Sequence, residues 1–186
     1  MKLKMFLSAV LATVAMGAAA TAASANTPVS ITPGGAAQAI FAQGGIVFSA
    51  AGQVADCPLT LNLSLLTNSI VLADGLLNIG FVTGGNIDPN PCRELNITLL
   101  FSPQWLIAVT SFNPATGNAN ITILNVQVDA NGCLFRGTVT ATINARSGSV
   151  NAITNPSGSL SGPIICGGTA TVSGTGGVLS PGQTIS

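Results

Sequence analysis

The sequence predicts an all-β fold: a single-domain β-sandwich or irregular antiparallel barrel of about ten short strands. Apolar and polar residues alternate with a period of two over several segments, and helix-type periodicity is nearly absent. Gly, Pro, Asn and Asp interrupt these segments about every 8–12 residues, which is the spacing of turns in such folds. No charged or proline-rich linker divides the chain, so we expect one hydrophobic core.

The N-terminus has the three parts of a secretory leader. Lys2 and Lys4 give a positive start, residues 5–19 are apolar, and Ala23-Ser24-Ala25 is a small-x-small cleavage site. A membrane anchor is the competing interpretation, but this apolar run is short and the cleavage site follows it directly. We therefore expect residues 1–25 to be a cleaved, Sec-type bacterial signal peptide, which makes the protein secreted and extracellular.

The mature chain, residues 26–186, is expected to form the single β domain. It has no stretch of roughly 18 uninterrupted apolar residues, so no transmembrane segment is predicted. A small outer-membrane barrel would carry girdles of aromatic residues, whereas this chain has one Trp and no Tyr. We therefore do not expect a membrane-spanning protein.

Export to an oxidising compartment gives the four cysteines, Cys57, Cys92, Cys133 and Cys166, a structural interpretation. Spacing alone allows three pairings. The intervals from the first to the second and from the third to the fourth are 35 and 33 residues, and each begins at an alternating strand. This loose duplication predicts two disulfides, Cys57–Cys92 and Cys133–Cys166. A metal site is the alternative, but the sequence has no CxxC pair and no His.

The clearest predicted strand covers residues 59–65, where leucines alternate with Thr, Asn and Ser, so that one face is buried. Residues 138–143 repeat this pattern, with Val, Ala and Ile inward and the threonines outward. The alternation changes parity between Ile123 and Val126, which predicts a bulge near Leu124.

Shorter alternating or β-branched segments predict the other strands, at residues 45–51, 69–73, 76–82, 95–101, 105–112 and 170–173. Turn-forming residues predict the connections, at Asp74-Gly75, Gly84-Gly85, Asp88-Pro89-Asn90-Pro91, residues 114–118, Asn131-Gly132 and Asn155-Pro156. The two ends of the mature chain, residues 26–37 and the Gly-rich residues 174–186, are expected to be looser.

The composition excludes several kinds of chemistry. Without His there is no Ser-His triad, no Cys-His dyad and no histidine metal site. The three arginines after the leader provide no electrostatic footprint for nucleic acid. Asp74, Asp88 and Asp129 fall in predicted turns, where Asp caps its own backbone. A glycosidase would need Glu94 and one Asp facing across a cleft, and nothing favours that pair. We expect no enzyme, no catalytic residue, no metal and no cofactor.

The predicted surface is low in charge. Residues 26–186 hold three arginines and five acidic residues, a formal charge of −2, so the outward faces are mostly uncharged polar residues and Gly. Such a surface is weakly self-repelling, which suits either a protease-resistant extracellular domain or an adhesive one. Trp105 is the only large amphipathic aromatic residue. It belongs either to the buried core or to an exposed anchor, a candidate contact for an apolar or sugar-like ligand.

Four features occur together in the mature chain. They are a Thr/Gly/Ala-rich entry, a cysteine that opens an alternating strand, a central Pro-x-Trp element, and a Cys–Gly–Thr–Val–Thr strand followed by Ser-containing closing motifs. These features lie at Thr32-Pro33-Gly34-Gly35, at Asp56-Cys57-Pro58-Leu59-Thr60-Leu61, at Pro103-Gln104-Trp105 leading to residues 120–126, and at residues 133–140, 172–175 and 180–185. In them the chain resembles a family of small secreted bacterial proteins called activators of alkane oxidation, some of which are regarded as biofilm-promoting adhesins.

The resemblance implies no catalytic residues. It implies a secreted accessory protein that acts where cells meet hydrophobic substrates or surfaces. We therefore expect a non-enzymatic adhesion or accessory protein of the cell surface or matrix, with a role in alkane utilisation or biofilm formation. Its expected partner is a hydrophobic surface, a hydrocarbon or a second copy of the chain. The alternative is a self-assembling structural subunit of an extracellular fibre or coat.

Overall fold

The computed structural model describes residues 29–72, 74–88, 96–146 and 150–186. The strands of these ranges are β1 (Ile31–Thr32), β2 (Gly35–Phe41), β3 (Val47–Ala50), β4 (Gln53–Asp56), β5 (Leu59–Val71), β6 (Leu77–Ile87), β7 (Ile97–Leu99), β8 (Trp105–Asn113), β9 (Asn118–Ala130), β10 (Cys133–Asn144), β11 (Asn151–Ser161), β12 (Thr169–Ser173), β13 (Gly176–Ser180) and β14 (Thr184–Ile185). A short 3-10 helix, η2 (Ile164–Cys166), precedes β12. The predicted all-β fold is confirmed.

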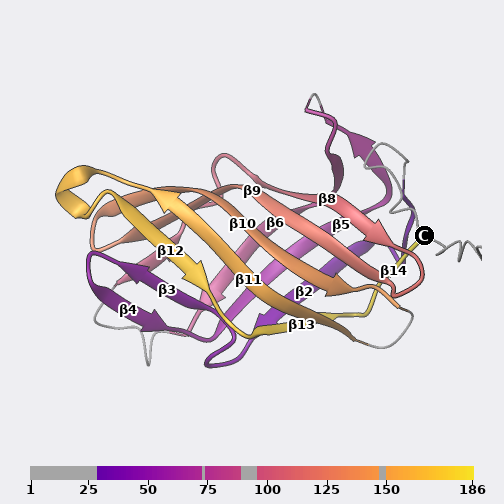
Figure 1. The fold of residues 1–186 in the computed structure, drawn as a ribbon, viewed down its shortest axis with the longest axis horizontal. Helices are drawn as coiled ribbons and strands as arrows, with labels where there is room; N and C mark the ends of the chain where they lie inside the picture. The colour runs from indigo at the N-terminus through magenta and orange to yellow at the C-terminus, as the bar shows by residue number, and fades with distance from the viewer. Residues whose placement is uncertain (1–28, 73, 89–95, 147–149) are drawn as a thin grey trace, which may run out of the picture.

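Eight of these strands close into an antiparallel barrel. They are hydrogen-bonded in the order β10-β9-β8-β6-β5-β2-β13-β11, and pairing between β10 and β11 completes the circle (Figure 1). Strands β12, β3 and β4 extend the sheet from β11, and β7 pairs with β9. Strands β1 and β14 form a separate pair, with β14 at the right-hand end of the barrel in Figure 1. Of the two predicted architectures, the structure is the barrel.

The barrel interior is apolar because its strands alternate as the sequence predicts. In β5, Leu59, Leu61, Leu63 and Leu65 are all buried. The intervening Thr, Asn and Ser residues face outward and are half-buried or exposed. The inward faces of the other barrel strands carry the same kinds of apolar residue, so that the core fills the barrel interior. Side chains can just fill an eight-stranded barrel, or the barrel can hold one small ligand.

The predicted turn between β9 and β10 and the predicted bulge in β9 are confirmed. Asn131 and Gly132 join the strands, with φ angles of 54° and 79°, as the tight turns of antiparallel hairpins require. Val126 pairs with Gly137 and Ile123 with Val139, so one strand has an extra residue and a bulge at this point. Asn125, inside the bulge, adopts a φ of 61°.

Two predicted turns are instead parts of strands. Gly84 and Gly85 lie within β6, where a Cβ on Gly85 would come within 2.9 Å of the Leu61 side chain and the Thr60 carbonyl oxygen. Gly85 therefore allows close packing of β6 against β5, and the chain does not reverse at this point. Asn155-Pro156 lies within β11, where Asn155 has a φ of 52° and the register with β10 shifts. These two turn-forming residues produce a bulge in β11 instead of a reversal of the chain.

The predicted looseness of the two ends is also wrong. Residues 176–180 form β13, which lies between β2 and β11 and is part of the barrel wall. At the other end of the chain, β2 begins at Gly35 and pairs with β5 over its whole length. The strand predicted at residues 69–73 is not a separate element, because β5 continues as far as Val71. The Gly-rich segment carries no strand signal because glycines show no alternation of apolar and polar side chains, although they allow strands to approach closely.

The Cys133–Cys166 disulfide is confirmed, with its Cα atoms 6.0 Å apart. Cys57 is buried. Its predicted partner Cys92 lies outside the described residues, so the Cys57–Cys92 pairing stays a prediction. The expected signal peptide of residues 1–25, residues 89–91 of a predicted turn, and Glu94 lie outside them as well. Within the described ranges, no helix is long and apolar enough to cross a membrane.

Candidate functional site: an apolar cavity in the barrel

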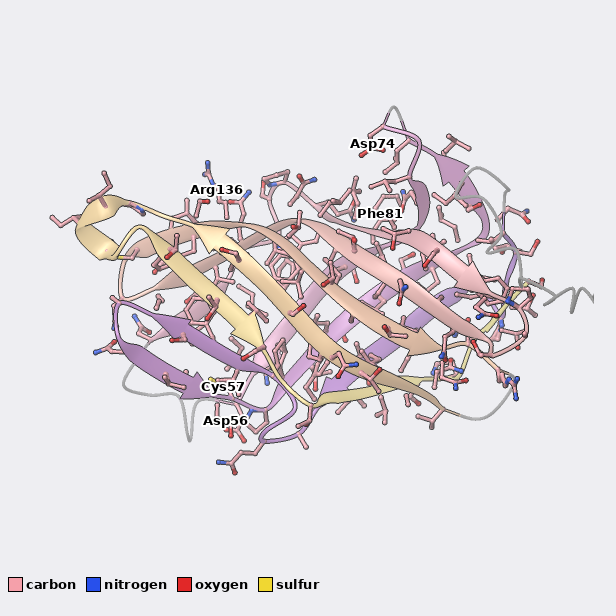
Figure 2. All side chains as sticks on the ribbon, in the orientation of Figure 1. Asp56, Cys57, Asp74, Phe81 and Arg136 are labelled. Carbon is pink, nitrogen blue, oxygen red and sulfur yellow. A yellow bond between two sulfur atoms is a disulfide. The ribbon has the colours of Figure 1, made fainter. Side chains whose placement is uncertain are left out.

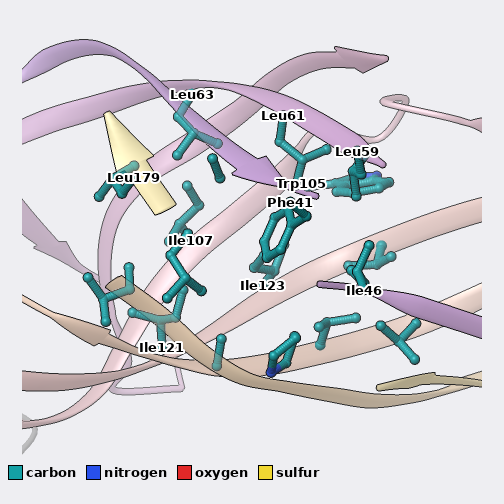
Figure 3. A pocket seen from close by; sticks show the side chains of 18 of the residues that line it. Phe41, Ile46, Leu59, Leu61, Leu63, Trp105, Ile107, Ile121, Ile123 and Leu179 are labelled. Carbon is teal, nitrogen blue, oxygen red and sulfur yellow. The ribbon is translucent and has the colours of Figure 1, made fainter. Parts of the chain in front are cut away.

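The barrel encloses a cavity of about 120 Å³. Inward-facing residues of all eight barrel strands line it, together with residues of β1, β3, β4, β7, β12 and β14. Figure 3 shows the side chains of Phe41, Leu61, Trp105, Ile107 and Ile121 among those that surround it. With few exceptions these side chains are aliphatic or aromatic.

The residues that line the cavity extend along the barrel strands. Its lining follows β5 from Leu59 to Leu65, a distance of roughly 20 Å along a strand. At one end it includes Phe48 of β3, and at the other Ile185 of β14. Small side chains, such as Ala39, line the cavity without filling it.

Trp105 forms part of the cavity wall. Its side chain is only 3% exposed, and its ring lies 4.8 Å from that of Phe101, measured between centroids. The indole Nε1–H donates a hydrogen bond of 2.7 Å to the carbonyl oxygen of Leu100, so its polar atom is satisfied. The structure therefore places Trp105 in the core and not on the surface. An apolar contact of Trp105 would be made with a molecule inside the barrel.

One polar side chain, that of Gln183, also lines the cavity. Gln183 lies just before β14 and is 3% exposed. Its backbone N–H donates to Oδ1 of the buried Asn151, and its side-chain Nε2 donates to the Pro181 carbonyl oxygen at 3.0 Å. Its Oε1 has no hydrogen-bond partner among the described residues. This buried amide has no signal in the sequence, because only the tertiary fold buries a glutamine of the Gly-rich end.

The carboxylates have structural roles where the structure describes them. Asp74 accepts a hydrogen bond from the Leu76 N–H at 3.1 Å, and Asp129 accepts one from the Gly132 N–H at 2.8 Å, as predicted for turn residues. Asp56 accepts from the Gly44 N–H at 2.6 Å. Asp56 and Asp74 lie at opposite sides of the molecule (Figure 2). Among the described residues, no group of acidic or cysteine side chains could hold a metal ion.

The most exposed large apolar residues lie on η2. Ile164 is 92% exposed and Ile165 is 94% exposed. The following residue, Cys166, is joined by the disulfide to Cys133. This apolar tip, Ile164 and Ile165, belongs to the loop at the left-hand end of Figure 1, away from β14. Its signal in the sequence is a pair of adjacent isoleucines that interrupts the alternation.

The fold and its cavity define a closed antiparallel β-barrel with an apolar interior, an architecture that can enclose one small apolar ligand. Comparison of the chain with protein-family models, curated proteins and solved structures finds no match. The function is therefore argued from the cavity and the surface.

Proposed function

We propose that this chain is a secreted, non-enzymatic binding protein that holds a small apolar molecule inside its barrel. The observation that supports the proposal is the cavity of about 120 Å³, whose lining is almost entirely apolar. Burial of apolar surface in such a space is favourable, by about 25 cal/mol per Å² removed from water. Among the described residues, the lining has no acidic or basic side chain.

The volume of the cavity limits the size of the ligand. An engineered apolar cavity of about 150 Å³ stays dry and binds benzene, so a space of about 120 Å³ suits a molecule of roughly that volume. The lining follows β5 from Leu59 to Leu65, so the ligand we propose is an unbranched hydrocarbon chain that lies along the strands. This ligand class agrees with the resemblance to proteins of alkane utilisation, and with an accessory role where cells meet hydrophobic substrates.

The proposal is tested by ligand-induced stabilisation of the mature protein. A ligand that binds only the folded state raises the free energy of unfolding by about 2.7 kcal/mol at 100 times its Kd. We expect hexane to raise the melting temperature in a concentration-dependent manner. The variant Ala39→Leu fills part of the cavity and should lose this response.

Ala37 provides a matched control for Ala39. It is buried on the same inward face of β2, but it does not line the cavity. We expect Ala37→Leu to lower the stability through overpacking and to retain the response to hexane. An equal response of wild type and Ala39→Leu would place the ligand elsewhere, and no response of the wild type would refute the proposal.

A second candidate function is attachment to an apolar surface through Ile164 and Ile165. These side chains are almost fully exposed, and the Cys133–Cys166 disulfide tethers the turn that carries them. This is the adhesive role expected from the sequence, with contact residues other than Trp105. Self-assembly into a fibre or coat is the further alternative. It would use the edge of β4, which pairs only with β3 among the described strands.

A further inference from the structure

The apolar tip, Ile164 and Ile165, is far more exposed than the other large apolar residues that the structure describes. The two side chains are 92% and 94% exposed, whereas the next most exposed one, Val54, is 68% exposed. Single exposed apolar residues are common on protein surfaces, but an adjacent pair that is almost fully exposed indicates contact with an apolar partner. The tip lies at one end of the long axis of the molecule, and β14 lies at the other (Figure 1).

The loop that carries the tip, residues 162–168, satisfies much of its own backbone. Four backbone N–H groups donate to carbonyl oxygens of the same loop, at 2.9 to 3.0 Å; they belong to Gly162, Cys166, Gly167 and Gly168. The loop has no polar side chain. Inside a lipid layer no water is present, so the protein itself must satisfy its backbone polar groups. This loop therefore loses fewer hydrogen bonds with water on entering an apolar phase than a loop with open backbone would.

The base of the loop is fixed to the barrel. The disulfide joins Cys166 to Cys133, the first residue of β10. Gly162 lies directly against Phe135, because a Cβ at this glycine would overlap the Phe135 ring. Isoleucine is branched at Cβ and has few rotamers. The tip is thus held in its exposed position before it binds, so binding costs little conformational entropy.

The contact area of the tip is too small for a protein partner. Two isoleucine side chains offer at most a few hundred Å², whereas a stable interface between proteins, including two copies of this chain, buries about 1,200 Å² or more. Residues 150–186 also carry no charged side chain that could add specific contacts. A lipid bilayer requires no such area, because its interfacial region accepts apolar side chains to a depth of about 5–10 Å.

We propose that the apolar tip inserts into the interfacial region of a phospholipid bilayer and docks the protein there, with the β14 end directed away from the lipid. This rests on the second candidate function given above and names its surface. Docking through two side chains is reversible, since even a single myristoyl chain gives only marginal membrane binding.

The first test is sedimentation of the mature protein with neutral phosphatidylcholine vesicles, on which attraction by charge is minimal. We expect the bound fraction to rise with lipid concentration. Ile164→Ser/Ile165→Ser should bind about tenfold less tightly or worse, because it removes the apolar surface that is buried. Ile70→Ser/Val71→Ser is the matched control, with side chains that are 55% and 54% exposed in the wild type, and it should bind like the wild type.

The second test locates the inserted residues by fluorescence. Bromine atoms on lipid acyl chains quench a Trp that touches them. We expect vesicles of such lipids to quench the added fluorescence of Ile165→Trp and not that of Ile70→Trp. The native Trp105 is 3% exposed, so it gives the same background in both variants. Because the substituted side chains are exposed, urea midpoints should confirm that all variants fold.

Equal quenching of the two Trp variants, or equal vesicle binding of the wild type and the tip variant, would overturn insertion through the tip. Binding to hydrocarbon droplets without binding to vesicles would overturn the bilayer as the surface and leave the second candidate function in place. Binding to neither would refute that function as well. Stabilisation by hexane reports on the cavity alone, so the first proposed function is judged separately.

Discussion

The disulfide between Cys133 and Cys166 connects the first residue of β10 to the last residue of η2. It thereby ties the loop that carries Ile164 and Ile165 to the barrel wall. The bridge closes a segment with a sequence separation of 33 residues. Both its effect on stability and the presentation of the two isoleucines follow from this connection.

Removal of this bridge should weaken the fold. In the variant Cys133→Ala/Cys166→Ala we expect the free energy of unfolding to fall by about 4 kcal/mol, because the unfolded chain regains the entropy of an open loop. Urea denaturation followed by Trp fluorescence measures this change. A single-alanine change at the half-exposed Leu134 would serve as a control for altered β10 packing. An unchanged urea midpoint would mean that the bridge contributes no stability.

The apolar tip should attach the protein to hydrophobic surfaces independently of charge. A formal charge of −2 on residues 26–186 gives little electrostatic steering. Binding to hydrocarbon droplets should therefore persist or increase as salt rises. The variant Ile164→Asn/Ile165→Asn should lose most of this binding.

The chain offers a matched control for the apolar tip. Ile70 and Val71 are also adjacent and are 55% and 54% exposed, but they lie at the end of β5. The variant Ile70→Asn/Val71→Asn should bind droplets like the wild type. A tenfold loss of wild-type binding at moderate salt would indicate a charge-mediated attachment, and equal losses in both variants would show that the tip has no special role.

Trp105 should report the state of the cavity. It is the only Trp of the chain and is 3% exposed. We expect fluorescence emission typical of an apolar environment and weak quenching by acrylamide. Since Trp105 lines the cavity, hexane should change its emission, and Ala39→Leu should abolish that change. Strong acrylamide quenching of the folded protein would contradict the buried position.

Gly176 should be essential for closing the barrel. A Cβ at this residue would overlap the Ile153 carbonyl oxygen on the neighbouring strand β11, and its φ is 119°. We expect Gly176→Ala to lower the free energy of unfolding by more than about 3 kcal/mol. Gly52 has a φ of 80° but open space around it, so Gly52→Ala should cost only about 1–2 kcal/mol. Equal losses, measured by urea denaturation, would show that the positive φ alone matters.

The parts of the fold that local pattern determines could be predicted from the sequence. The strict alternation of β5 fixes its buried face, and Asn131-Gly132 has the chemistry of its turn. The change of parity before Val126 reveals the bulge in β9. The turns predicted at Gly84-Gly85 and Asn155-Pro156 are wrong, because the same residue types also occur at bulges and at close contacts inside strands.

The candidate site could not be predicted in this way. An inward-facing residue is recognisable from its alternation, but whether the inward side chains fill the space depends on how the strands meet. Ala39 illustrates this, because the residues next to it in the sequence do not show that it lines the cavity. The burial of Gln183 and the exposure of Ile164 likewise depend on segments far away in the chain.

Because of the position of β13, the barrel wall can be completed only late in folding. Residues 176–180 separate β2 from β11, so the wall has a gap until these residues have been synthesised and have paired. Up to that point β2 and β11 have open edges, and the interior leucines of β5 are accessible from one side. Pairing of the last strands with the first involves a large sequence separation, which makes this step slow and leaves the edges exposed to other chains. Insertion of β13 between β2 and β11 is therefore the step that closes the wall over the interior.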